Sequence, residues 1–258
     1  MEKITSKSNN LIKEVKKLFT SRRARYENRK FVLEGARLCF DALNSGCVPE
    51  IVLLTEKARE KYADICLSLE KAASDSYLIT RELADKIGET QNTQGIFAVC
   101  KMNGSALSLC SGKKYIALDE IQDPSNLGAI IRTAEALGLD GAILYNCCDI
   151  YNPKALRASM GSILRMSFLF SESLASDIEN FKKSGFSVYS AVPDSSACDI
   201  REVAFSGSDI CVIGNEGNGV SKAVLDASDR LITINMQGRA ESLNAFAAGA
   251  ITMWEMLR

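Results

Sequence analysis

The second half of the chain alternates apolar runs with helical patterns, and this alternation limits the possible folds more than any other feature. Near-continuous apolar runs predict strands at YIALD (115–119), GAILY (141–145), FSVYSAV (186–192), DICVIG (209–214) and RLITINM (230–236). Helices are expected over 126–138, 153–162, 174–184, 220–227 and 243–257. Strands that lack polar alternation are typical of parallel sheets covered on both faces. Residues 115–258 therefore predict an α/β domain on a parallel sheet.

A smaller α/β pattern precedes this domain. A helix over 11–19 places Leu11, Val15, Leu18 and Phe19 on one apolar stripe. Strands are expected at 31–35, 50–54, 76–79 and 95–101, with helices over 36–45 and 56–72 and a short one after residue 79. The stretch NGSALSLCSGKK at 103–114 has the small and polar residues of a linker. We predict a domain over 1–105, a linker over 106–114 and a second domain over 115–258.

Composition excludes several classes of protein. No run approaches about eighteen apolar residues, and MEKITSKSNN at the N-terminus has no apolar signal region, so we expect neither a membrane protein nor a secreted one. The nine cysteines form no C-x-x-C pair and the chain has no histidine, so the usual zinc spacings are absent and no metal is expected. The missing histidine also excludes His-based catalytic triads. We expect a cytoplasmic protein with reduced thiols.

Positive charge is concentrated at the N-terminus. Residues 1–30 hold ten Lys/Arg against three Asp/Glu, a net charge of +7. Because the whole chain has a net charge of −1, the remaining residues carry −8. This asymmetry favours an anionic partner for the N-terminal segment, and a merely solvated helix face is the alternative.

Three segments in the second domain carry polar residues next to predicted strand ends. In DEIQDPSNLGAIIRTAEALG (119–138), Pro124 suits the first turn of a helix. The apolar stripe of that helix leaves Arg132 and Glu135 facing outward. Taken alone, this segment needs no function, with Asn126 as a capping residue and Arg132 paired with Glu135 in solvent.

The other two segments follow the last two predicted strands. GNEGNGVS (214–221) is a glycine-dense turn that leaves backbone N–H groups open to a ligand, unless it is only a strand-to-helix turn. A carboxylate inside it, Glu216, is expected to be buried and to bind or organise a site. In INMQGRAESLNAFAAGAITMWEMLR (234–258), Ser242 is expected as the N-cap of a helix rich in small residues, and an ordinary C-terminal helix is the alternative.

Together these segments resemble the SpoU family of RNA ribose 2′-O-methyltransferases, within the SPOUT superfamily of TrmH-like enzymes. The resemblance covers DPSNLGAIIRTAEALG, NPKALRASMGSILRM (152–166), GNEGNGVS and INMQGRAESLN, in the family's order. SKSNNLIKEVKKL, FVLEGARLCFDAL and TQGIFAV resemble the L30e-like substrate-binding domain of many members. The chain departs from the family at Asn235, where a proline is usual, and at 245–247, where Val-Ser-Val is usual. These departures leave the polar residues intact.

The resemblance implies a parallel-sheet SPOUT domain with a deep trefoil knot, which no periodicity can indicate. It implies S-adenosylmethionine as cofactor and a homodimer whose active site combines residues of two chains. It implies a catalytic and substrate-organising set of Asn126, Arg132, Glu216, Ser242 and Asn244. It implies a cofactor-binding set of Gly214, Asn215, Gly217, Ile234, Met236 and Leu243. Arg157, in the RASMGS stretch, is a candidate RNA contact.

The expected function is S-adenosylmethionine-dependent ribose 2′-O-methylation of structured RNA. Ribosomal RNA is favoured over transfer RNA because the L30e-like domain resembles ribosomal RNA-binding proteins. A tRNA methyltransferase and a non-catalytic RNA-binding protein on the same scaffold stay open as alternatives. A nicotinamide-dependent oxidoreductase is disfavoured because no G-x-G-x-x-G follows a first strand.

The roles of two charged residues follow from this function. Because an arginine with a pKa above about 12 stays charged at pH 7, we expect Arg132 to bind a phosphate or the developing alkoxide rather than to remove a proton. Glu216 is expected to orient Asn126 or an arginine of the second chain.

Overall fold

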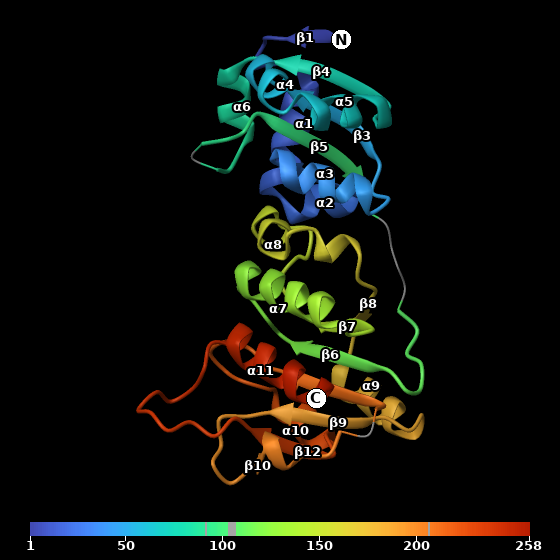
Figure 1. Ribbon diagram of the computed structural model, residues 1–258, viewed down its shortest axis with the longest axis vertical. Helices are drawn as coiled ribbons and strands as arrows, with labels where there is room; N and C mark the ends of the chain where they lie inside the picture. The colour runs from blue at the N-terminus through green and yellow to red at the C-terminus, as the bar shows by residue number, and fades with distance from the viewer. Residues whose placement is uncertain (91, 103–106, 206) are drawn as a thin grey trace. The chain divides into compact units, whose positions relative to one another are not determined.

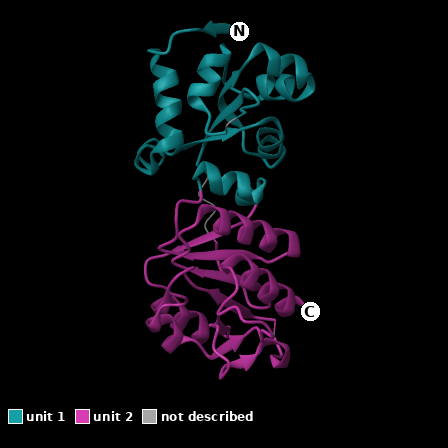
Figure 2. Ribbon diagram, turned by 90° about the vertical axis from the view of Figure 1, so that its left-hand side faces the viewer, with its two compact units in different colours: residues 1–104, 151–164 teal, residues 105–150, 165–258 magenta. Residues whose placement is uncertain are grey.

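The computed structural model describes residues 1–90, 92–102, 107–205 and 207–258. The chain divides into two compact units, one of residues 1–104 and 151–164 and the other of residues 105–150 and 165–258 (Figure 2). The predicted boundary at residues 105 and 106 lies outside the described residues, so the predicted domain limits stay a prediction. No helix in the described ranges is long and apolar enough to cross a membrane.

The first unit is built on a five-stranded mixed sheet (Figure 1). Its strands are β1 (Glu2–Ile4), β2 (Lys30–Glu34), β3 (Pro49–Leu54), β4 (Asp75–Ile79) and β5 (Ile96–Lys101), in the spatial order β1-β4-β3-β5-β2. Only β5 runs antiparallel to its neighbours β2 and β3. The helices are α1 (Asn10–Thr20), α2 (Arg22–Asn28), α3 (Ala36–Asn44), α4 (Glu56–Lys61), α5 (Ala63–Ala72), α6 (Arg81–Ile87) and α8 (Pro153–Ser159).

Helix α1 shows how the basic segment folds. Asn9 caps it by accepting a hydrogen bond from Leu11 N, and its buried stripe begins at Ile12, with Leu11 only half-buried. The helix ends at Thr20, and the hydroxyl of the next residue, Ser21, caps α2. Arg25 of α2 is buried and donates to the carbonyl oxygens of Leu18 and Phe19. One of the ten cations in residues 1–30 therefore closes the end of a helix instead of facing solvent.

The second unit is built on a seven-stranded sheet in which every pairing is parallel. Its strands are β6 (Lys114–Asp119), β7 (Gly141–Tyr145), β8 (Phe168–Ser171), β9 (Ser187–Ala191), β10 (Cys198–Asp199), β11 (Asp209–Ile213) and β12 (Arg230–Thr233), in the order β10-β12-β9-β11-β6-β7-β8. The predicted α/β class with a parallel sheet is confirmed. Strands β8 and β10 were not predicted from the sequence, and the knot stays a prediction.

Helices cover both faces of this sheet. The helices are α7 (Pro124–Leu137), α9 (Leu174–Lys183), α10 (Lys222–Ala227) and α11 (Ala245–Leu257). Helices α9 and α10 share a core cluster with alternate strand residues such as Tyr115, Ala117 and Val212. Helices α7 and α11 pack against each other, and α11 also packs on β11. Ile213 lies against Gly249 of α11, at 3.7 Å from the position that a Cβ would take.

The centre of this sheet is a switch point of the topology. Strands β6 and β11 are neighbours, but the chain leaves β6 through α7 toward β7 and leaves β11 through α10 toward β12, on the other side. Ligands of open parallel sheets bind at the carboxyl ends of strands where the connections diverge in this way. We therefore expect a ligand-binding site near the carboxyl ends of β6 and β11.

Candidate functional site

The glycine-dense segment 214–221, here called the glycine loop, follows β11 and closes on itself. The backbones of Asn215 and Gly219 exchange two hydrogen bonds of 2.9 Å, and Asn215 Oδ1 accepts from the N–H groups of Gly217 and Asn218. A Cβ on Gly214 would lie 2.1 Å from Val220 N, so no other residue fits there. The loop is thus a compact unit rather than an open turn.

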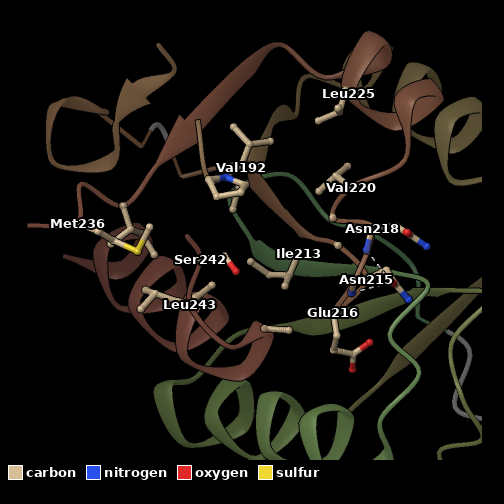
Figure 3. Close-up of a pocket in the computed structure, with 18 residues that line it drawn as sticks. Val192, Ile213, Asn215, Glu216, Asn218, Val220, Leu225, Met236, Ser242 and Leu243 are labelled. Carbon is tan, nitrogen blue, oxygen red and sulfur yellow. Dashed lines mark hydrogen bonds between the residues drawn. The ribbon is translucent and has the colours of Figure 1, made fainter. Parts of the chain in front are cut away.

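The glycine loop is joined to the start of α7 by one carboxylate. Glu216 Oε2 accepts from Gln122 N at 3.1 Å, and Glu216 Oε1 accepts from Asp123 N and Asn126 Nδ2, each at 3.0 Å. Figure 3 shows the Glu216 side chain pointing toward the helix drawn in green. A carboxylate at a helix N-terminus is stabilised by the free N–H groups and the helix dipole.

Two properties of Glu216 follow from this position. Partial burial raises its pKa, but the hydrogen bonds from Asn126, Gln122 and Asp123 lower it by more, and the net pKa lies below the usual value. The residue is exposed in this single chain, so the expectation that it is buried was wrong. Glu216 therefore lies at the exposed edge of the site. Hydrogen-bond donors fix the position of its carboxylate, and core side chains do not enclose it.

The third segment joins the same network through Asn244. Asn244 Nδ2 donates to Asn126 Oδ1 at 3.1 Å, and Asn244 Oδ1 accepts from Phe246 N at 2.9 Å. Asn244 is therefore the N-cap of α11, and the expectation that Ser242 caps this helix was wrong, because the helix begins at Ala245. Asn126 in turn is not a cap, since Asp123 caps α7.

Arg132 does not contact the network of Glu216, Asn126 and Asn244 in the described chain. It lies on the exposed side of α7, six residues and about 9 Å along the helix axis from Asn126. It makes no hydrogen bond or ion pair with another residue in the described ranges. Glu135 instead pairs with Arg165 through two hydrogen bonds of 2.7 and 3.0 Å, so the alternative without a function, in which Arg132 pairs with Glu135, was wrong.

A cavity of about 370 Å³ opens at the carboxyl ends of β9, β11 and β12 (Figure 3). It falls within the usual size of small-molecule sites. Its lining includes the whole set that was expected to bind a cofactor, namely Gly214, Asn215, Gly217, Ile234, Met236 and Leu243. Glu216 and Ser242 line it as well, and apolar side chains such as Val192 and Ile213 form much of its wall.

One side of this cavity was not predicted from the sequence. Ala191, Val192 and Pro193 at the end of β9 are part of the lining. Their apolar run predicts a strand, but the sequence does not reveal that this strand lies beside β11. The order of strands in the sheet is the information that was lacking.

Arg157 lies on α8, within the first unit. Its guanidinium is 3.8 Å from a carboxylate oxygen of Glu89 and 4.0 Å from one of Glu34. The side chain of Arg157 is 33% exposed, so part of it still faces solvent. The expectation that it contacts RNA stays a prediction.

Known proteins resemble this chain in both units. The SpoU rRNA Methylase family matches residues 113–254, and the MRM3-like substrate binding domain matches residues 9–98. The 23S rRNA (guanosine(2553)-2'-O)-methyltransferase RlmP of Bacillus subtilis is 33% identical over 257 residues, which is 99% of each chain.

Solved structures resemble it as well. An AdoMet-bound rRNA methyltransferase from Sinorhizobium meliloti has a TM-score of 0.87 at 26% identity, covering 99% of this chain and 97% of that one. An RNA 2'-O ribose methyltransferase has a TM-score of 0.85 at 26% identity, covering 99% and 98%. The family model matches more than half of the chain and a relative above 30% identity spans it, so the chain belongs to the SpoU rRNA methylase family.

Proposed function

We propose that this protein is an S-adenosylmethionine-dependent RNA ribose 2′-O-methyltransferase that acts on ribosomal RNA. The observation that carries the proposal is the hydrogen-bonded chain from Glu216 through Asn126 to Asn244, which ties three separate segments together beside a cavity of cofactor size. The family and the similarity to an rRNA-modifying relative support the reaction and the class of RNA.

The cavity suits an amphipathic nucleoside. Val192, Ile213 and Leu243 offer apolar walls for a purine, and the backbone of the glycine loop offers polar groups beside them. When bound, S-adenosylmethionine supplies a methyl group that the neighbouring sulfonium charge makes electrophilic. The residues that would hold it are the six of the expected cofactor set, together with Val192 and Ile213.

The polar network positions the ribose. Glu216 fixes the amide of Asn126, because Asn126 donates to it while accepting from Asn244. Both amides therefore have one orientation, which reduces the entropy lost when a hydroxyl is placed for attack. Ser242 faces the same cavity and adds a hydroxyl to the site. The proton of the 2′-hydroxyl leaves late, to solvent or to a phosphate of the substrate.

Arg132 acts in the site of a second copy. Helix α11 exposes apolar side chains, namely Phe246, Ile251, Trp254 and Leu257, with Trp254 at 61% exposure. Such a surface on a helix that packs against α7 suits a homodimer contact. A dimer through α7 and α11 would present Arg132 of one chain to the network of the other, where its charge would bind a phosphate or the developing alkoxide.

The first unit provides the RNA contact. Exposed cations lie along α1 and α2 and just after them, namely Lys13, Lys17, Arg22, Arg23 and Arg29. Phosphate contacts of this kind bind structured RNA through its shape rather than its sequence. The reaction takes place in the cytoplasm, where ribosomal RNA is processed.

Methyl transfer to RNA from cells that lack the gene tests the activity. Purified protein should transfer tritiated methyl groups to ribosomal RNA, and mapping of 2′-O-methyl positions should reveal one that is missing in those cells. If only transfer RNA were labelled, the substrate would be transfer RNA instead of ribosomal RNA. If no RNA were labelled, the result would favour a non-catalytic RNA-binding protein.

Mixed subunits test the shared site. R132A and E216A proteins should each be inactive, but a mixture restores one intact site in each heterodimer, so about a quarter of the wild-type activity should return. No recovery would place Arg132 and Glu216 in the same chain's site. The variant R132K tests the charge, since steep recovery at high pH would instead support Arg132 as the base.

A further inference from the structure

Asp119 is a fully buried carboxylate that no motif singled out. It is the last residue of β6, its exposure is 0%, and it lies at the switch point of the sheet. Asp119 Oδ2 accepts a 2.7 Å hydrogen bond from Ser221 N, while Asp119 Oδ1 has no hydrogen-bond partner among the described residues. Burying a carboxylate of which only one oxygen accepts a hydrogen bond lowers the stability of the fold. We therefore expect Asp119 to serve a function at this position.

Ser221, its partner, is the far end of the glycine loop. Because the loop closes between Asn215 and Gly219 and packs Gly214 against Val220, a bond at Ser221 fixes the loop as one body. The near end of the loop is held by the next residue of the same strand end, since Asn215 Nδ2 donates to Glu120 O at 2.8 Å.

The residue that accepts this hydrogen bond has an uncommon backbone conformation. Glu120 has a positive φ of 61°, which is uncommon for a residue with a side chain. Residues 119–123 thus hold the glycine loop at three places: at Ser221 through Asp119, at Asn215 through Glu120, and at Glu216 through Gln122 and Asp123. Of these three attachments, only the one made by Asp119 comes from a charge inside the core.

We propose that Asp119 is a positioning residue that sets the shape of the cofactor cavity by anchoring Ser221. It touches neither the cavity nor a reacting atom and acts through the glycine loop. The inference rests on the proposed function, because it assigns the cavity to S-adenosylmethionine.

The test compares Asp119 with a matched buried carboxylate. Asp209 begins β11, the strand beside β6, is also 0% exposed, and accepts a 2.7 Å hydrogen bond from Gly207 N, but it lies at the opposite end of its strand from the cavity. D119A should raise the Kd for S-adenosylmethionine by at least about tenfold, as expected when a charge-assisted hydrogen bond that shapes a site is lost. D209A should leave that Kd within about twofold even where it lowers Tm.

Two further readouts separate positioning from a general loss of stability. D119N keeps the volume and one acceptor oxygen for Ser221 N, so it should recover most of the affinity for the cofactor. The affinity of D119A for ribosomal RNA should equal that of the wild type, because the RNA-binding cations lie in the first unit. A merely structural role would lower Tm in D119A and leave the cofactor Kd unchanged below that temperature, which would overturn the inference.

A second replacement of Asp119 covers the case in which D119A fails to fold. D119V suits a strand, fills the buried position with an apolar side chain and offers Ser221 N no acceptor. The same rise in Kd is expected, and an unchanged Kd in D119V would overturn the inference. If the wild type itself binds no S-adenosylmethionine by calorimetry, the proposed function fails first, and this outcome is distinct from equal binding by wild type and variant.

Discussion

The glycine loop (214–221) and the segment 234–244, here called the second loop, border one cavity but are held in different ways. The glycine loop is tied to itself and to residues 119–126 by backbone and side-chain hydrogen bonds. The second loop is exposed from residue 237 to 244, and within the described residues its side-chain hydrogen bonds come from Asn235 and Asn244. The first loop is preorganised, whereas the second has room to adjust to a cofactor, RNA or a second chain.

The largest contrast is expected between two glycine substitutions. G214A forces a Cβ to within 2.1 Å of Val220 N, so it should disrupt the glycine loop, destabilise the protein by about 1–3 kcal/mol or more and reduce cofactor affinity on the order of 100-fold. G238A in the second loop meets nothing within 4 Å and should change affinity by less than about threefold. Calorimetry and thermal unfolding measure both. Equal effects would mean that the two loops are held alike.

A smaller effect on stability and cofactor affinity is expected from substitution of the carboxylate that ties the glycine loop to α7. E216Q keeps one acceptor oxygen and brings its amide NH₂ either against the N–H of Gln122 or against the donors of Asp123 and Asn126. Either clash should shift the contact between the glycine loop and Asn126 and reduce methyl transfer on the order of 100-fold, with less loss of cofactor affinity. E241Q, on the exposed second loop, is the matched control and should be nearly neutral. Full activity in E216Q would contradict the proposal that Glu216 positions Asn126.

Two substitutions of Asn244 distinguish its role as the N-cap of α11 from its hydrogen bond to Asn126. N244A loses the cap of α11 and the bond to Asn126, so it should lower stability by about 0.5–2 kcal/mol and activity by about tenfold. N244D keeps a good capping oxygen but cannot donate to Asn126 Oδ1, so it should recover stability and not activity. Recovery of both by N244D would show that the second loop contributes only a helix cap.

The smallest effect concerns pH. Because hydrogen bonding holds the pKa of Glu216 below its ordinary value of 4.5, the carboxylate stabilises the folded protein fully above about that pH. This contribution is lost as the pH falls through the lowered pKa. The difference in Tm between wild type and E216Q should therefore be constant from pH 6 to 8 and shrink below about pH 4. A difference that grows in acid would contradict the lowered pKa.

Sequence patterns predicted the elements that are long and apolar. All five strands expected in the second unit are present. They could be predicted because strands that are buried along nearly their whole length consist of nearly continuous apolar residues. Strand β8 was missed because it is a four-residue edge strand that is only partly buried, and β10 has two residues. Helix α2 was missed because its seven residues are mostly polar or charged and form no apolar stripe.

The candidate site was predicted in part for a related reason. Family motifs named residues that line the cavity and residues of the hydrogen-bonded network around Glu216, but they also named Arg132, which lies outside both. The cap at Asn244, the exposure of Glu216 and the partner of Glu135 depend on how distant segments meet, which no local pattern records. Asp119 went unnoticed because a single carboxylate at a strand end carries no spacing signal.

The packing of α8 bears on how such enzymes can be recombined. Residues 151–164 interrupt the second unit in sequence but belong to the first, where Tyr151 stacks on Phe31 at 4.8 Å and Pro153, Ala155 and Leu156 are buried. A truncated protein that simply lacks residues 1–104 would leave these apolar side chains without their cover. A chimera that exchanges RNA specificity between relatives should therefore transplant two discontinuous pieces, the N-terminal segment and residues 151–164, as one cassette.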